Sequence, residues 1–158
     1  MSSAFECVGD FHTQFGHPKP DSIQSNVFQE NPQLVVFRLS LIDEEVRELH
    51  QACRDSNMTE VIDALADILY VVYGMGQALG INLDQAFKIV HESNMSKLCR
   101  NEQEAIDTLA HYKTLSDFSN LDIRYRLAQD GKHFVVYNAE TGKILKNKYY
   151  IPADFSSM

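Results

Sequence analysis

The apolar segment from Val61 to Ile81 most constrains what this chain can fold into. It is long enough for one helix and apolar on nearly every side, so that helix has to lie at the centre of the fold or against a partner chain. Asp63 and Asp67 interrupt the segment, which speaks against a membrane span. The glycines between Gly74 and Gly80 are expected to end the helix.

Helical patterns continue on both sides of this segment. Further helices are expected over Ser3 to Phe15, Leu34 to Arg54, Leu83 to Leu98 and Glu102 to Lys113. Asn57 or Thr59 can cap the central helix, and Asn82 the helix that follows it. The last of these helices is expected to be exposed, and the polar stretch from Asp21 to Pro32 to be a loop.

The pattern changes after Ser116. Short β-like runs are found at Arg124 to Leu127, Phe134 to Tyr137 and Ile144 to Ile151. Asp130-Gly131 and Thr141-Gly142 separate them as turns. We therefore expect an all-α fold, an oligomeric four- to five-helix bundle with a small C-terminal β-hairpin appendage. A single domain would cover residues 1–158, with a helical body over 1–115 and a short-strand appendage over 116–158.

Composition narrows the classes of partner. The 22 acidic residues against 14 lysines and arginines give a formal charge of −8, which argues against a nucleic-acid polymer as ligand. A free nucleotide is still compatible, because a bound metal can reverse the local sign. Cys7, Cys53 and Cys99 show no CxxC spacing and indicate a reducing compartment. No secretory signal pattern opens the chain, so we expect a cytoplasmic protein that does not enter a membrane.

Two clusters of acids occur on consecutive predicted helices. They are Glu44, Glu45 and Glu48 on the first helix and Glu60, Asp63 and Asp67 on the second. Residues three or four apart share a helix face, and a short loop makes the two helices antiparallel neighbours, so the acids are expected to face one another. Carboxylates held side by side repel, and a divalent cation offsets that repulsion. An all-oxygen donor set without His or Cys favours Mg²⁺, with Mn²⁺ as an alternative.

The same acids also allow structural interpretations. Glu44 or Glu45 can pair with Arg38 or Arg47. Glu60 can belong to a capping box with Asn57, and Asp67 can accept a hydrogen bond from Tyr70. Five acids in the pattern EExxE followed by ExxD nevertheless favour a metal site over these readings.

EExxE followed by ExxD resembles the MazG-like, or all-alpha, nucleoside triphosphate pyrophosphohydrolase superfamily. This group includes dimeric dUTPases and phosphoribosyl-ATP pyrophosphohydrolases. Further matching segments are Val8-Gly-Asp-Phe-His12, Val61-Ile-Asp-Ala-Leu-Ala-Asp67 with its continuation to Gly74, Val90-His-Glu-Ser-Asn-Met-Ser-Lys97, and Gly142-Lys-Ile-Leu-Lys146. These matches are scattered over most of the chain.

The resemblance implies roles for individual residues. Glu45, Glu48, Glu60 and Asp63 would ligate magnesium, and Glu44 would orient or deprotonate the attacking water. Asn94 and Lys97 would contact the phosphate chain. Apart from the resemblance, Lys143 and Lys146 are candidates to reach the phosphates from a neighbouring chain, with surface lysines on a hairpin as the alternative. The rings of His12, Phe11, Phe15, Tyr70 and Tyr73 are candidates to stack on the base, with core packing as the alternative. The family also pairs its chains, so a homodimer or a dimer of dimers is expected.

The implied reaction splits a nucleoside triphosphate into its monophosphate and pyrophosphate. Its expected role is to remove unwanted or excess nucleotides from the nucleotide pool. Alternatives are a phosphoribosyl-ATP pyrophosphohydrolase of histidine biosynthesis and a non-catalytic helical regulator that binds metal or nucleotide. A ferritin-like di-iron protein is set aside, because the chain has no Glu-x-x-His pairs. The insert at about 98–141 departs from the family pattern, and an added lid and a contact surface for another subunit are the two roles open to it.

Overall fold

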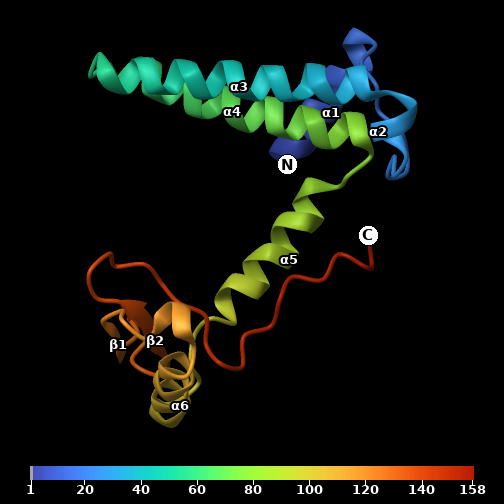
Figure 1. Ribbon diagram of the computed structural model, residues 1–158. Helices are drawn as coiled ribbons and strands as arrows, with labels where there is room; N and C mark the ends of the chain where they lie inside the picture. Colours follow the sequence, from blue (N-terminus) through green and yellow to red (C-terminus); the bar gives the residue numbers. More distant parts are fainter. Residues whose placement is uncertain (1) are drawn as a thin grey trace. The chain divides into compact units, whose positions relative to one another are not determined.

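A computed structural model describes residues 2–158. Two long helices dominate the part of the chain up to Ala86 (Figure 1). These helices are α3, Pro32–Arg54, and α4, Met58–Leu79. Each begins at an asparagine whose side chain accepts a backbone N–H of the first turn, Asn31 from Leu34 and Asn57 from Glu60. Only residues 55–57 join the helices, so they run antiparallel and pack along their length.

The N-terminal helix α1, Ala4–Phe15, packs on α4. Ser3 and Glu6 form a complete capping box at its start. The Gln77 side chain of α4 donates to the Phe5 carbonyl at 2.8 Å, which ties the two helices together. The polar stretch predicted as loop contains a single helical turn, α2, Val27–Glu30.

Helix α4 continues past the first glycines and ends at Gly80. Gly80 has the left-handed conformation, with φ 69°, and a Cβ there would overlap the Ser22 carbonyl. A Cβ at Gly76 would lie 2.6 Å from the Leu83 side chain, so this glycine admits the returning chain without breaking the helix. The glycine cluster therefore serves packing as well as termination.

The chain divides into two compact units at a boundary between Ala86 and Phe87, inside helix α5, Leu83–Met95. The second unit, Phe87–Ser157, contains α6, Glu102–Lys113, the 3-10 turn η1, Ser116–Phe118, and an antiparallel pair of strands. These strands are β1, Ile123–Leu127, and β2, Phe134–Asn138, with Tyr125 opposite Val136. Two of the three predicted strand runs are thereby confirmed.

The prediction that Glu102 to Lys113 is an exposed helix is wrong. One face of α6 packs on the strand pair and buries Ala105, Thr108 and Tyr112. Ala105 and Tyr112 join Cys99, Val136 and Leu145 in the core of the second unit. Ile106 and Ala110 between them are exposed, so apolar residues lie on both faces of α6 and obscure its amphipathic pattern in the sequence.

The structure describes residues Ile144 to Ile151, but the third strand that was predicted there does not form. This segment forms one isolated bridge, Ile144 with Tyr137, and Leu145 N–H donates to the Val136 carbonyl. After Leu145 the segment is held by hydrogen bonds that involve side chains, where a strand would have backbone hydrogen bonds to its neighbour. The Tyr112 hydroxyl donates to the Lys146 carbonyl at 2.8 Å, and the Asn147 amide donates to the Leu98 carbonyl at 3.0 Å.

Within residues 2–158 the structure has six α-helices and one two-stranded antiparallel sheet, so the predicted all-α fold with a β-hairpin appendage is confirmed. A single domain stays a prediction, because two compact units can still work as one domain. Many large apolar side chains of α3 and α4 are exposed in the single chain, among them Val36, Phe37, Leu39, Ile62, Leu65 and Leu69. By length and composition alone α4 could also cross a membrane.

Candidate active site

The acids predicted to face one another do so along the groove between α3 and α4. On α3, Leu41, Glu45 and Glu48 follow helical spacing on one face, as do Asp63 and Asp67 on α4. Glu48 and Asp63, with Glu60, line a cavity of about 220 Å³ near the turn between the helices. The groove thus concentrates negative charge contributed by both helices.

The pKa of Glu45 is shifted by its burial and by the surrounding negative charge. Partial burial is the main cause that raises the pKa of its carboxyl above the ordinary value. The neighbouring charges of Glu48, Asp67, Glu44 and Asp63 raise it further, in that order. One carboxylate oxygen of Glu45, Oε2, is buried and has no hydrogen-bond partner. A buried, unpartnered oxygen among like charges is costly in the free protein.

The structural interpretations of these acids find little support among the described residues. No ion pair joins Arg38 or Arg47 to Glu44 or Glu45 within residues 2–158. The Arg47 guanidinium instead donates to the Asp43 backbone carbonyl at 3.1 Å. Glu60 meets Asn57 through its backbone N–H, which leaves the Glu60 carboxylate available. The acids therefore carry charges that the described chain does not neutralise.

The donor set fits a hard divalent cation. Glu45, Glu48, Glu60 and Asp63 offer carboxylate oxygens along this stretch of the groove, and the buried Glu45 Oε2 has no hydrogen-bond partner. In the side-chain positions described for residues 2–158, no three such groups already converge on one metal position. The carboxylates of Glu48, Glu60 and Asp63 are exposed, so they are free to rotate toward a cation.

The remaining predicted site residues belong to different parts of the chain. His12 is buried on α1, with Nδ1 2.7 Å from the Pro18 carbonyl. Asn94 and Lys97 lie together in the second unit, where Lys97 Nζ donates to Asn94 Oδ1 at 2.7 Å. Lys146, in the same unit, lies over the Tyr150 ring at 4.8 Å. The roles of these four residues stay predictions.

The sequence prediction missed Arg38 as a site residue, and it gave no role to Asp67, one of the facing acids. Asp67 acts on Glu45 more strongly than Glu44 or Asp63 does. Arg38 is 5% exposed and has a buried, unpartnered Nε. Helical spacing in the sequence could have identified both residues. Arg38 precedes Glu45 by seven residues and Asp67 follows Asp63 by four, which places each on the acidic face of its helix.

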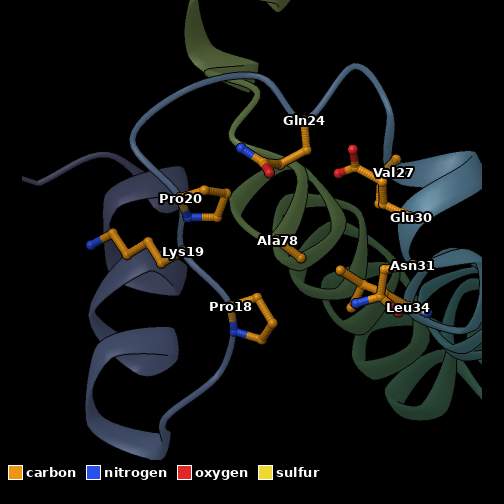
Figure 2. A pocket seen from close by; sticks show the side chains of 9 residues that line it. All are labelled: Pro18, Lys19, Pro20, Gln24, Val27, Glu30, Asn31, Leu34 and Ala78. Carbon is orange, nitrogen blue, oxygen red and sulfur yellow. Dashed lines mark hydrogen bonds between the residues drawn. The ribbon is translucent and has the colours of Figure 1, made fainter.

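Another cavity, of about 380 Å³, lies at the end of α3 away from the acids (Figure 2). Pro18 and Pro20 stand on one side of it and Glu30, Asn31 and Leu34 on the other, with Ala78 between them. Leu34 and Glu44 are separated by ten helical residues, or roughly 15 Å. Since this cavity lacks a set of converging acids, it does not compete with the groove as an active site.

This chain is similar in sequence to known proteins. The family model described as phosphoribosyl-ATP pyrophosphohydrolase matches residues 8–94. The chain belongs to this family. The match contains α1 from Val8 onward, all of α3 and α4, and all six groove acids, and it includes His12 and Asn94 but not Lys97 or Lys146.

Membership makes the protein a pyrophosphohydrolase of the MazG-like, all-alpha superfamily. An uncharacterized protein of Acanthamoeba polyphaga mimivirus is 36% identical, over 98% of this chain and 94% of that protein. Its similarity extends through the second unit, which lies beyond the family match except for residues 87–94.

Proposed function

We propose that this phosphoribosyl-ATP pyrophosphohydrolase family member hydrolyses a ribo- or deoxyribonucleoside triphosphate to its monophosphate and pyrophosphate, with Mg²⁺ as cofactor. The observation that carries the proposal is the Glu45 carboxylate, which is half-buried, unpartnered at Oε2 and surrounded by four other acids. Such an arrangement is unfavourable until a cation binds, and a cation there would also attract the phosphate chain.

In this proposal Glu45, Glu48, Glu60 and Asp63 hold the metal, and Asp67 on the facing helix adds negative charge near Glu45 that attracts the cation. Bound Mg²⁺ would offset the negative charge of the phosphates and hold them in position for attack of water on phosphorus. Glu44, the exposed acid beside Glu45, accepts a proton from the attacking water. The water oxygen bonds to one phosphorus of the α–β bridge, the bridging P–O bond breaks, and pyrophosphate leaves.

A second candidate substrate is phosphoribosyl-ATP, which the description of the matching family names. The same acids would serve either substrate, because both reactions break an α–β phosphate bridge. The acids alone do not select between them, so the substrate panel below includes both.

We further propose that the protein works as a cytoplasmic homodimer, or a dimer of such dimers. The exposed apolar side chains of α3 and α4, including Val36, Ile62 and Leu69, give a second copy a surface to cover. Light scattering coupled to size-exclusion chromatography tests this, and a monomer at micromolar concentration would contradict it.

The reaction is tested with Mg²⁺ and a panel of ribo- and deoxynucleoside triphosphates together with phosphoribosyl-ATP. Products are separated by chromatography, with Glu48→Ala and a chelator as controls. Monophosphate plus pyrophosphate from one or a few substrates, lost in both controls, is the expected result. Metal or nucleotide binding without any turnover would instead favour the non-catalytic regulator.

A further inference from the structure

A second cavity, of about 270 Å³, opens along the same groove beside the acids. It is lined by Phe11 and His12 of α1, by Arg38 of α3, by Tyr70 and Gly74 of α4, and by His17. Arg38 precedes Glu45 by two helical turns, or about 10 Å along α3. On α4, Tyr70 and Gly74 continue the spacing of Asp63 and Asp67 along one face. A nucleotide whose phosphates meet the acids would therefore direct its base toward this cavity.

Four of the nine residues that line the cavity carry aromatic rings, and Val8, Leu41 and Val71 add aliphatic side chains. Phe11 contacts Tyr70 edge to face at 5.7 Å and stacks on His17 at 5.8 Å. The volume is near the lower end for small-molecule pockets, which suits a flat ring system better than a whole nucleotide. Rings arranged in this way favour a flat aromatic guest.

Arg38 is the unexplained group in this cavity. It is 5% exposed, its Nε has no hydrogen-bond partner, and no ion pair neutralises it within residues 2–158. Its closest polar partner is His17, with Nη2 3.5 Å from Nδ1. A buried guanidinium is strongly unfavourable without acceptors, and a ligand that brings an acceptor removes this penalty.

His12 supplies the complementary group. A carbonyl can only accept, so the contact with the Pro18 carbonyl assigns the proton of the neutral ring to Nδ1 and leaves Nε2 as an acceptor. Desolvation lowers the pKa of His12, which keeps the ring neutral near pH 7. A Cβ at Gly74 would lie 3.2 Å from Arg38 Nη1 and 3.4 Å from His12 Nε2. Gly74 thus lets a donor and an acceptor border the same small space.

We infer that Arg38 and His12 recognise a nucleobase by its lactam edge, the carbonyl oxygen and adjacent N–H that uracil, thymine, guanine and hypoxanthine share. Arg38 donates to the carbonyl oxygen and His12 Nε2 accepts from the ring N–H. Cytosine and adenine present an amino group and a bare ring nitrogen in the same places. Their amino group would oppose the Arg38 donors and their ring nitrogen the His12 acceptor. The inference rests on the proposed function for the position of the phosphates.

The test uses nucleosides, which carry no phosphate and need no metal. Binding of uridine, thymidine, inosine, guanosine, cytidine and adenosine to the metal-free protein is followed by NMR chemical-shift titration. We expect the lactam nucleosides to bind roughly ten- to a hundredfold more tightly than cytidine and adenosine, the discrimination that a well-placed bidentate contact gives. Equal binding of the two groups, or no binding of either, overturns the inference.

Variants assign the preference to these residues. Arg38→Met keeps the length of the side chain and removes its donors, and it is expected to reduce the preference to less than about threefold. Arg54→Met, at the exposed end of the same helix, is the matched control and keeps the preference. Retention of the full preference in a folded Arg38→Met protein overturns the assignment. If that variant does not fold, His12→Phe and the nucleoside series on the unmodified protein still decide the question.

Failure here and failure of the proposed reaction can be distinguished. Discrimination between nucleosides without hydrolysis of any triphosphate would support the base pocket and reject the enzyme. Hydrolysis of all triphosphates with equal kcat/KM, unchanged by Arg38→Met, would support the enzyme and reject the base pocket.

Discussion

The two units of this protein treat their charged side chains in opposite ways. In the second unit, charges are paired at Arg100–Glu104, at Arg124–Asp122 and at His133–Asp130. In the described residues of the first unit no ion pair forms, although Arg38 is buried and Glu45 lies near four other acids. Unpaired charge is costly where water is excluded, so the first unit keeps groups that a ligand would satisfy. Among the described residues, the two buried side-chain atoms that lack a hydrogen-bond partner, Arg38 Nε and Glu45 Oε2, both belong to the first unit.

The largest expected effect comes from a groove acid. Glu45→Gln removes one charged metal ligand while keeping shape, and we expect the Mg²⁺-dependent kcat/KM to fall by at least roughly a hundredfold. Steady-state kinetics on the preferred triphosphate measure the loss. Asp43→Asn, an exposed acid of the same helix, is the control and is expected to stay near wild type. A similar loss in both variants would remove the distinction between groove acids and surface acids.

In the second unit the largest effect is expected on stability. Leu145 is 7% exposed in the core, so Leu145→Ala should lower the free energy of unfolding by about 2–5 kcal/mol. Ile144→Ala, one residue earlier and 44% exposed, is the matched control and should cost much less. Urea unfolding followed by circular dichroism measures both. Equal losses would mean that residues 144–145 do not alternate between core and solvent as described.

A smaller effect tests the cost of the unpaired acid itself. Without metal, Glu45→Gln should stabilise the protein at pH 7 by about 1 kcal/mol, or roughly 2–4 °C in Tm. Because the folded protein raises the pKa of Glu45, its contribution to stability is present below the ordinary glutamate pKa and is lost as pH rises through the raised value. The difference between variant and wild type should therefore vanish near pH 4. Thermal unfolding at both pH values measures it, and a destabilised variant at pH 7 would contradict it.

The smallest effect is expected at a paired, exposed charge. Hydrogen bonds from the His133 and Lys132 backbones and from the His133 ring hold the pKa of Asp130 well below its ordinary value. Asp130→Asn should lower Tm slightly at pH 7, because exposed pairs contribute little. The loss should disappear only when the pH falls through the lowered pKa of Asp130. Thermal unfolding between pH 7 and strongly acidic pH measures this, and a loss as large as that of Leu145→Ala would contradict the small contribution expected of an exposed ion pair.

The sequence predicted most of the helices because their signals are local. Helix α6 has the bounds that its pattern predicts, and α3 begins two residues earlier than predicted because Pro32 suits the first helical position. The missed features depend on partners distant in the chain. Ile144 to Ile151 has strand-like composition, but its hydrogen bonds go to side chains and carbonyls of other elements. The burial of α6 depends on where β2 lies.

The sequence by itself determined the helical class, the hairpin of α3 and α4, and the six acids at helical spacing, because periodicity and caps act over a few residues. Only the tertiary structure decided which charges lack a partner. The burial of Arg38, the unpartnered Glu45 oxygen and the position of Arg38 and His12 beside Gly74 depend on how α1, α3 and α4 pack together. Burial and desolvation depend on what surrounds a side chain from every side, and no local pattern carries that information.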